Sequence, residues 1–296
     1  MLKQTVLKFA IAATALMLGA ATASAQTIVV GGKNFTEQQL ISEMTAQLLR
    51  AKGFTVDKRA GLGTAAVRQA QEAGQVDVYW EYTGTSLITF NKITDKLDPA
   101  ATYAKVKELD AAKGLVWLDP SKANNTYALA MRKADASAKG IKSISDLAGK
   151  VKGGDNLKLA SNAEFYARPD GLAPLQKTYG FEFGRENVVR MDTGLVYQAL
   201  RDSQVAVGLV FATDGRVPAF DFVILTDDKG FFPNYALTPV VRKETLDKNP
   251  KLAEHLNALS AKLDDATMAK LNASVDVDKK TIEEVAASFL KAQGAV

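Results

Sequence analysis

Two stretches of the chain, 129 positions apart, repeat one pattern of residues. Residues 66–84 and 195–215 each contain a helical pattern, a Gln-Val pair, an alternating strand pattern and a small polar loop. Tyr82 and Phe211 hold the same place in the two stretches, at the end of the strand. A strand and its helix bury their apolar faces only against further elements, so the repeat predicts two similar α/β lobes. Each lobe would place an aromatic ring at an equivalent strand end.

Strand and helix patterns alternate in the rest of both halves. They predict strand, helix and strand at 27–30, 36–50 and 54–58, and again at 157–161, 170–179 and 187–191. Such β-α-β units predict parallel or mixed sheets covered by helices. From residue 243 to residue 292 the pattern is mostly helical.

The first 25 residues have the pattern of a secretory signal peptide. Two lysines precede an apolar run at 9–23, and Ala23-Ser24-Ala25 offers small residues to a signal peptidase. The run is shorter than the roughly 20 residues that a membrane-spanning helix needs. We therefore expect cleavage between Ala25 and Gln26 and a mature protein in the periplasm.

The residue counts exclude several kinds of site. The 296 residues include no cysteine and only one histidine, His255, so thiolate metal sites and histidine-based catalytic triads are not expected. The 37 basic and 33 acidic residues give a net charge of +4, too small and too mixed for a dedicated nucleic-acid-binding protein. We expect no metal and no cofactor.

Aromatic residues recur in polar loops at the predicted strand ends. They lie in five segments, at 79–85, 124–127, 164–168, 211–214 and 231–235. Ligands of open α/β sheets bind beyond the strand ends, so these rings would meet around a ligand. A cation whose charge is spread over methyl groups makes poor hydrogen bonds, and ring faces attract it instead.

Two basic residues have a related position. Lys33 and Arg168 each follow the first predicted strand of one lobe, near a helix start. A cation beside the N–H groups of a helix start can bind a carboxylate. A surface ion pair is the other interpretation that the sequence leaves open for each of them.

Six segments resemble the osmoprotectant-binding proteins of ABC importers, which bind glycine betaine, choline or carnitine. The segments are KNFTEQ at 33–38, EYTGT at 81–85, NNTYALA at 124–130, EFYARPDG at 164–171, MDTGL at 191–195 and FFPNYALTPVVR at 231–242. They span essentially the whole mature chain. The resemblance implies the fold of a type II periplasmic binding protein, in which hinge strands join two α/β lobes with the ligand cleft between them.

The resemblance also implies boundaries and site residues. Residues 26–124 and 235–296 would form lobe 1, and residues 125–234 would form lobe 2. An aromatic box would hold the quaternary ammonium group, and polar residues would hold the ligand carboxylate; by motif match these are Tyr82, Tyr127, Phe211 and Tyr235, and Lys33, Thr85 and Arg168. Relatives usually carry tyrosine at the position of Phe211, and phenylalanine keeps the ring face but lacks the hydroxyl.

The sequence thus predicts a solute-binding protein that captures glycine betaine or a related osmolyte and delivers it to an inner-membrane permease. We expect a monomer that binds its ligand without catalysis. The alternatives are a choline- or carnitine-preferring binding protein, a secreted hydrolase, or a scaffold without a ligand.

Overall fold

A computed structural model describes residues 27–296, so the predicted signal peptide lies outside the described residues. The described strands form two five-stranded sheets with the orders β2-β1-β3-β10-β4 and β7-β6-β8-β5-β9. The first sheet contains β1 (Ile28–Lys33), β2 (Val56–Leu62), β3 (Val78–Tyr82), β4 (Leu115–Trp117) and β10 (Leu237–Arg242). The second contains β5 (Tyr127–Arg132), β6 (Leu159–Ser161), β7 (Val188–Arg190), β8 (Val207–Phe211) and β9 (Phe222–Ile224).

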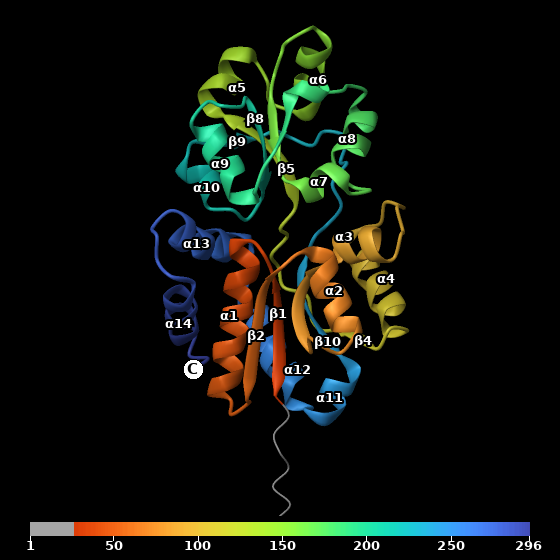
Figure 1. The fold of residues 1–296 in the computed structure, drawn as a ribbon, viewed down its shortest axis with the longest axis vertical. Coiled ribbons are helices and arrows are strands. Elements are labelled where there is room, and N and C mark those ends of the chain that lie inside the picture. Colours follow the sequence, from red (N-terminus) through yellow and green to blue (C-terminus); the bar gives the residue numbers. More distant parts are fainter. Residues whose placement is uncertain (1–26) are drawn as a thin grey trace, which may run out of the picture.

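Helices cover both sheets, and the two sheets lie one above the other along the long axis (Figure 1). The helices of the first lobe are α1 (Thr36–Ala51), α2 (Thr64–Glu72), α3 (Thr83–Thr85), the π-helix η1 (Ser86–Phe90), α4 (Pro99–Ala111), α11 (Lys243–Lys248), α12 (Lys251–Ser260), α13 (Asp265–Asp276) and α14 (Ile282–Ala292). Those of the second lobe are α5 (Lys133–Lys139), α6 (Ile144–Lys152), α7 (Ala163–Ala167), α8 (Leu172–Tyr179), the 3₁₀-helix η2 (Arg185–Asn187), α9 (Thr193–Arg201) and α10 (Arg216–Ala219).

The predicted repeat is present in the structure. Helix α2 and strand β3 in the first lobe correspond to α9 and β8 in the second, and both pairs of bounds differ by 129 positions. β3 lies parallel to β1 and antiparallel to β10, just as β8 lies parallel to β6 and antiparallel to β5. Equivalent strand ends therefore lie at equivalent places in the two lobes.

Strand β2 extends to Leu62, beyond the strand that the sequence pattern predicts at 54–58. Its polar residues do not resemble a buried strand, because β2 lies at the edge of the sheet. It pairs only with β1, in a parallel register that runs from Ile28 opposite Val56 to Lys33 opposite Leu62. One side of an edge strand remains accessible to water, which accounts for the polar run at 57–59. The pairing carries the strand up to the start of α2.

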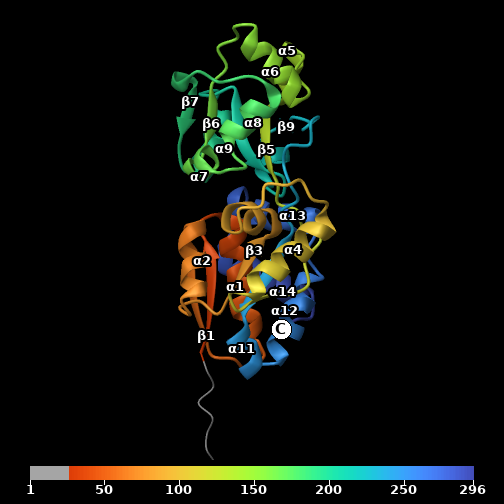
Figure 2. The same cartoon turned by 90° about the vertical axis from the view of Figure 1, so that its right-hand side faces the viewer.

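Two segments connect the lobes, at 118–126 and 225–236 (Figure 2), and they pair where residues 123–125 meet residues 235–237. The N–H of Asn125 donates to the carbonyl of Tyr235 at 3.2 Å, and the N–H of Leu237 donates to that of Ala123 at 2.9 Å. The Asn124 side chain also accepts the Tyr235 N–H at 2.8 Å. The chain thus passes between the lobes twice, through one paired connection. None of the helices in residues 27–296 is long and apolar enough to cross a membrane.

Candidate ligand-binding site

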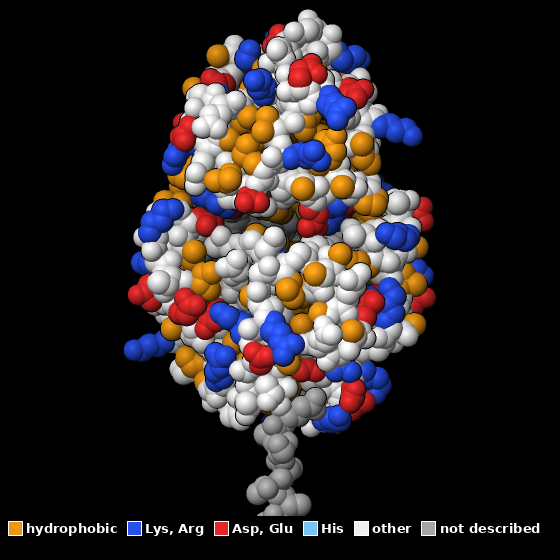
Figure 3. Space-filling view, viewed as in Figure 1, with side chains coloured by type: hydrophobic (Ala, Val, Ile, Leu, Met, Phe, Trp, Pro, Cys, Tyr) orange, Lys and Arg blue, Asp and Glu red, His pale blue; other side chains and the backbone are white. Residues whose placement is uncertain are grey.

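A cavity of about 1100 Å³ lies between the two lobes. Figure 3 shows a hollow across the middle of the molecule, with acidic side chains at its rim. The cavity is lined by all seven residues that the sequence singled out: Lys33, Tyr82, Thr85, Tyr127, Arg168, Phe211 and Tyr235. The structure therefore brings the predicted site residues together, and their roles toward a ligand stay predictions.

Strand pairing brings the aromatic residues to the cavity. Tyr82 and Phe211 end the equivalent strands β3 and β8, and Tyr127 begins β5 directly opposite Phe211. The ring centroid of Tyr127 lies 5.1 Å from that of Phe211 and 5.6 Å from that of Tyr235. These distances lie within the range of favourable ring contacts. Three of the four predicted box residues thus form one cluster, and Tyr127 is its centre.

Phe35 connects this cluster to the fourth ring. It precedes α1, and its centroid lies 5.4 Å from that of Phe211 and 6.3 Å from that of Tyr82. Phe35 was not among the predicted site residues. The signal was available, because the residue follows the first strand within KNFTEQ, as the other selected rings follow or precede strands.

Lys33 is buried at the end of β1 and paired with a carboxylate. Its Nζ donates to Oε1 of Glu81 at 2.5 Å, and the same Nζ lies 4.9 Å from the Tyr82 ring centroid. An ammonium group has three N–H donors, and Glu81 takes one of them. Lys33 therefore retains donors toward the cavity, although Glu81 already balances its charge.

Most N–H donors of Arg168 already have partners within the protein, so few remain for a ligand anion. Its Nε and Nη2 donate to the two carboxylate oxygens of Asp170 at 2.7 and 2.6 Å. Nη1 donates to Glu164 at 3.0 Å, and Nη2 also donates to Thr85 at 3.4 Å. Four of the five N–H donors of a guanidinium group are thereby used. The sequence left open a surface ion pair for Arg168; the structure shows an ion pair with Asp170, but both side chains are buried.

The tyrosines of the site are neutral phenols. Burial is the main cause that raises the pKa of Tyr82, Tyr127 and Tyr235. The Tyr82 hydroxyl donates to Oε1 of Glu37 at 2.8 Å, and the Tyr235 hydroxyl donates to Oδ2 of Asp170 at 2.5 Å. A phenol that donates to a carboxylate keeps its proton and gains electron density in its ring. These hydrogen bonds favour the attraction of a cation to the ring faces.

Glu37 is a site residue that no sequence pattern singled out, because an acidic residue in a first helical turn is ordinary. Its side chain is almost fully buried. One oxygen accepts from Tyr82 and Asn125, both at 2.8 Å, and the other accepts from Thr213 at 2.6 Å and Asn272 at 3.2 Å. Burial raises the pKa of Glu37, and the four hydrogen bonds oppose that rise.

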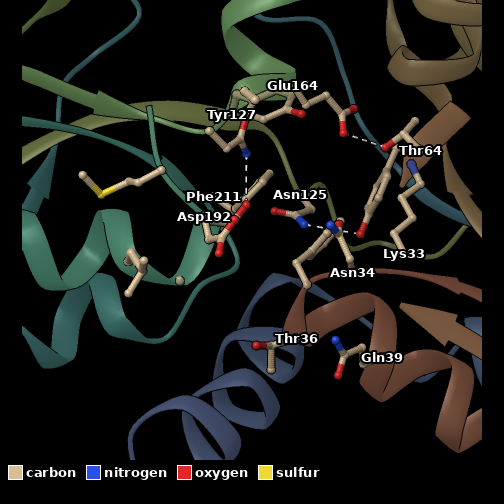
Figure 4. Close-up of a pocket in the computed structure, with 18 of the residues that line it drawn as sticks. Lys33, Asn34, Thr36, Gln39, Thr64, Asn125, Tyr127, Glu164, Asp192 and Phe211 are labelled. Carbon is tan, nitrogen blue, oxygen red and sulfur yellow. Dashed lines mark hydrogen bonds between the residues drawn. The ribbon is translucent and has the colours of Figure 1, made fainter. Parts of the chain in front are cut away.

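Polar contacts also cross the cavity from lobe to lobe. Figure 4 shows the Thr64 hydroxyl directed at Glu164, to which it donates at 2.8 Å. Arg216 at the start of α10 lies 3.3 Å from the Asp276 carboxylate at the end of α13. The two lobes are therefore in direct polar contact at both of these places.

Within residues 27–296, the side chains at the cavity include neither a cluster of metal-binding residues nor the histidine. Residues 27–296 contain no group of three or more His, Cys, Asp or Glu side chains placed to hold a metal ion. His255 lies on α12 against Phe54, outside the set of cavity-lining residues. Ring faces and two buried cations suit a ligand that combines a methylated cation with a carboxylate.

Residues 26–292 match the family model OpuAC, described as the substrate binding domain of ABC-type glycine betaine transport systems. A glycine-betaine-binding protein of Pseudomonas aeruginosa is 48% identical over 285 residues, which cover 94% of this chain and 92% of the relative. The glycine betaine-binding protein YehZ of Escherichia coli is 36% identical over 280 residues, or 92% of each chain. A crystal structure of a glycine betaine/carnitine/choline ABC transporter superposes with a TM-score of 0.75 at 30% identity, covering 90% of this chain and 99% of that one.

Proposed function

Because this chain belongs to the family of substrate-binding domains of ABC-type glycine betaine transport systems, we propose that its cavity captures glycine betaine or a related quaternary-ammonium compound. The match to family structures also confirms the predicted fold of a type II periplasmic binding protein with two α/β lobes. Capture then depends on the residues that hold the two ends of the ligand and on the response of the lobes.

The observation that carries the proposal is the meeting of aromatic rings from both lobes at one cavity. Tyr82 comes from the first sheet, Phe211 and Tyr127 come from the second, and Tyr235 lies on a connecting segment. Each contact between a quaternary ammonium and a ring face contributes roughly 0.5–2 kcal/mol. Methyl groups also lose little hydration on entering such a box, whereas a free ammonium loses its hydrogen bonds to water.

The proposed carboxylate partners lie beside this box. Lys33 keeps unused N–H donors, the Thr85 hydroxyl lies next to Arg168, and Arg168 keeps one N–H donor beyond its present partners. A ligand carboxylate that reached these groups would form charge-assisted hydrogen bonds in a buried place.

Capture would bridge the lobes and favour a closed arrangement. We place lobe 1 at 26–124 and 235–296 and lobe 2 at 125–234, with the paired connection as the hinge. The ligand favours closure by the difference in its affinity for the open and closed states. The closed form would then dock on an inner-membrane permease, as a monomeric periplasmic protein that leaves its ligand unchanged.

Choline is a second candidate, and the pairing of Arg168 favours it. Asp170 and Glu164 already use most donors of Arg168, so Arg168 has little left to offer a ligand carboxylate. The lack of a carboxylate therefore costs choline less binding free energy than the sequence alone suggests. Carnitine carries both a quaternary ammonium and a carboxylate, at a larger separation than in glycine betaine. Its affinity would therefore show whether the cavity accommodates a longer ligand.

Calorimetric titration with glycine betaine, choline, carnitine and glycine tests the proposal. We expect glycine betaine to bind far more tightly than glycine, since only its cation is fully methylated. Equal affinities for these two compounds would refute the aromatic box. Chemical analysis of betaine recovered after incubation separates binding from hydrolysis, because a hydrolase would return a changed compound.

A further inference from the structure

Glu37 differs from the other buried carboxylates around the cavity in its lack of a basic partner. Glu81 pairs with Lys33, Asp170 pairs with Arg168, and Asp214 pairs with Arg216. Within the part of the chain from 27 to 296, no Lys or Arg nitrogen lies within 4.0 Å of the Glu37 carboxylate. A buried carboxylate normally requires such a partner, so its absence calls for an explanation.

The hydrogen bonds of Glu37 are those of an ionised group. The amide nitrogens of Asn125 and Asn272 can only donate, and they reach different oxygens of the carboxylate. The hydroxyls of Tyr82 and Thr213 add one donor to each oxygen. The first turn of α1 places the group beside the positive end of the helix dipole, which favours negative charge. These contacts favour the ionised form without neutralising its charge, and they offset only part of the effect of burial, which still raises the pKa of Glu37.

The four donors connect Glu37 to the aromatic box. Tyr82 is itself a box residue, Asn125 lies two residues before Tyr127, and Thr213 lies two residues after Phe211. The carboxylate therefore lies behind the box, one phenol away from the space in which a ligand would meet the Tyr82 ring. Its position fits a countercharge that acts on the ligand without touching it.

We propose that Glu37 supplies the negative charge that balances the ligand's quaternary ammonium group, acting through the Tyr82 phenol. This inference rests on the proposed function of the cavity. Glu37 is then a positioning residue, and it gives the site a preference for a cation over a neutral group of the same shape. Aromatic rings alone would make similar apolar contacts with a cationic group and with a neutral group of the same shape. A buried unpaired negative charge distinguishes the two, because it attracts only the cation.

Acid should weaken this preference. Because burial raises the pKa of Glu37 above its ordinary 4.5, the carboxylate gains a proton as the pH falls through that raised value. The titratable or charged groups around it are the Tyr82 phenol on β3, Asp214 and Arg216 after β8, and Asp276 on α13. Burial also raises the pKa of Asp276, so the test must compare variants and not the wild type alone.

Glycine betaine and 3,3-dimethylbutanoate are the probes, because a neutral quaternary carbon replaces the ammonium nitrogen while the shape and the carboxylate are kept. Both are titrated calorimetrically into wild type, Glu37→Gln and Thr213→Val near neutral pH, where both ligands keep an ionised carboxylate. Betaine is titrated again at a series of lower pH values, because the carboxyl group of the isostere would itself take up a proton there. Thr213→Val is the matched control, since it removes one hydrogen bond across the same junction and leaves the charge.

We expect Glu37→Gln to weaken betaine about tenfold or more near neutral pH, with little change for the isostere. The Glu37→Gln variant should also lack the fall in betaine affinity at low pH, which wild type and Thr213→Val should both show. An equal loss of both ligands in Glu37→Gln, or an unchanged pH profile, would overturn the inference while leaving the proposed function in place. If Glu37→Gln does not fold, a wild-type affinity for betaine that stays constant over the whole acid range in which the protein remains folded overturns it. Failure of wild type to bind betaine at all would instead refute the proposed function.

Discussion

The rings of Phe35 and Phe211 lie nearly parallel, with centroids 5.4 Å apart and an angle of 8° between their planes. Phe35 precedes the first helix of the first lobe, and Phe211 ends the central strand β8 of the second. This contact therefore joins the lobes at the aromatic cluster itself. Any movement that opens the cavity must either separate the two rings or carry one of them along.

Phe35→Leu should weaken glycine betaine binding by about 0.5–1.5 kcal/mol, the usual contribution of one aromatic pair. Leucine fills most of the space but no longer holds the Phe211 and Tyr82 rings in place. Phe54→Leu is the matched control, because Phe54 contacts His255 away from the cavity. Calorimetric affinities and melting temperatures of both variants check the prediction, which fails if the two variants bind betaine equally well.

Substitutions at Phe211 distinguish a ring face from apolar volume. Phe211→Leu should cost roughly 0.5–2 kcal/mol of betaine affinity, whereas Phe211→Tyr should retain binding because it keeps the ring. If Phe211 serves only the core, the order reverses: leucine is tolerated and the buried tyrosine hydroxyl destabilises the fold. Titrations with betaine, accompanied by melting temperatures, show which order holds.

Arg168→Ala should weaken glycine betaine by about 2–5 kcal/mol and choline by much less, because only betaine offers a carboxylate. The structure adds a second expectation. The variant leaves the Asp170 carboxylate buried without its partner, so the free energy of unfolding should also fall. Equal losses of affinity for the two ligands would show that Arg168 serves the fold by holding Asp170.

The buried carboxylate of Asp110, in the first lobe and away from the cavity, should make the stability of the protein depend on pH. Burial by itself raises the pKa of Asp110, but hydrogen bonds and charge from Arg68 dominate and lower it to about 2 from 3.8. Because the folded-state pKa is depressed, the stabilisation is present above pH 3.8 and is lost as the pH falls toward 2. The loss of unfolding free energy should be about 2 kcal/mol, since a tenfold change in proton affinity corresponds to about 1.4 kcal/mol.

Urea unfolding at a series of acid pH values measures this loss. Asp110→Asn should be less stable than wild type near neutral pH and should lack the part of the acid dependence that belongs to Asp110. Glu108→Gln, on the exposed face of the same helix, should change the stability by less than about 0.5 kcal/mol. A wild-type profile that Asp110→Asn reproduces at every pH would contradict the assignment.

The repeat explains why much of the fold could be predicted from the sequence. Helical spacing, the Gln-Val pair and the strand pattern are local signals, and they placed α2 with β3 and α9 with β8 to within a few residues. Edge strand β2 was predicted too short, because its length depends on its pairing with β1 and not on its own residues.

The candidate site also contains residues that local sequence signals could indicate and residues that they could not. The rings of Tyr82 and Phe211 were visible as aromatic residues at strand ends, and Phe35 had the same signal. Glu37 had none, because its donors are distributed over the whole chain, from Tyr82 to Asn272. Spacing along one chain cannot show a contact between residues 235 positions apart. The pairing of Arg168 with Asp170 joins residues only two positions apart, so local sequence could indicate it.

The place of β10 in the first sheet has a consequence for the order of folding. β10 lies between β3 and β4, but it follows all the strands of the second sheet along the chain. The second sheet comes from one continuous stretch, residues 127–224, and can form as soon as that stretch is available. The first sheet instead depends on a pairing between distant segments, which forms slowly. We therefore expect the second lobe to fold ahead of the first, and a chain that ends before β10 leaves β4 without a partner strand.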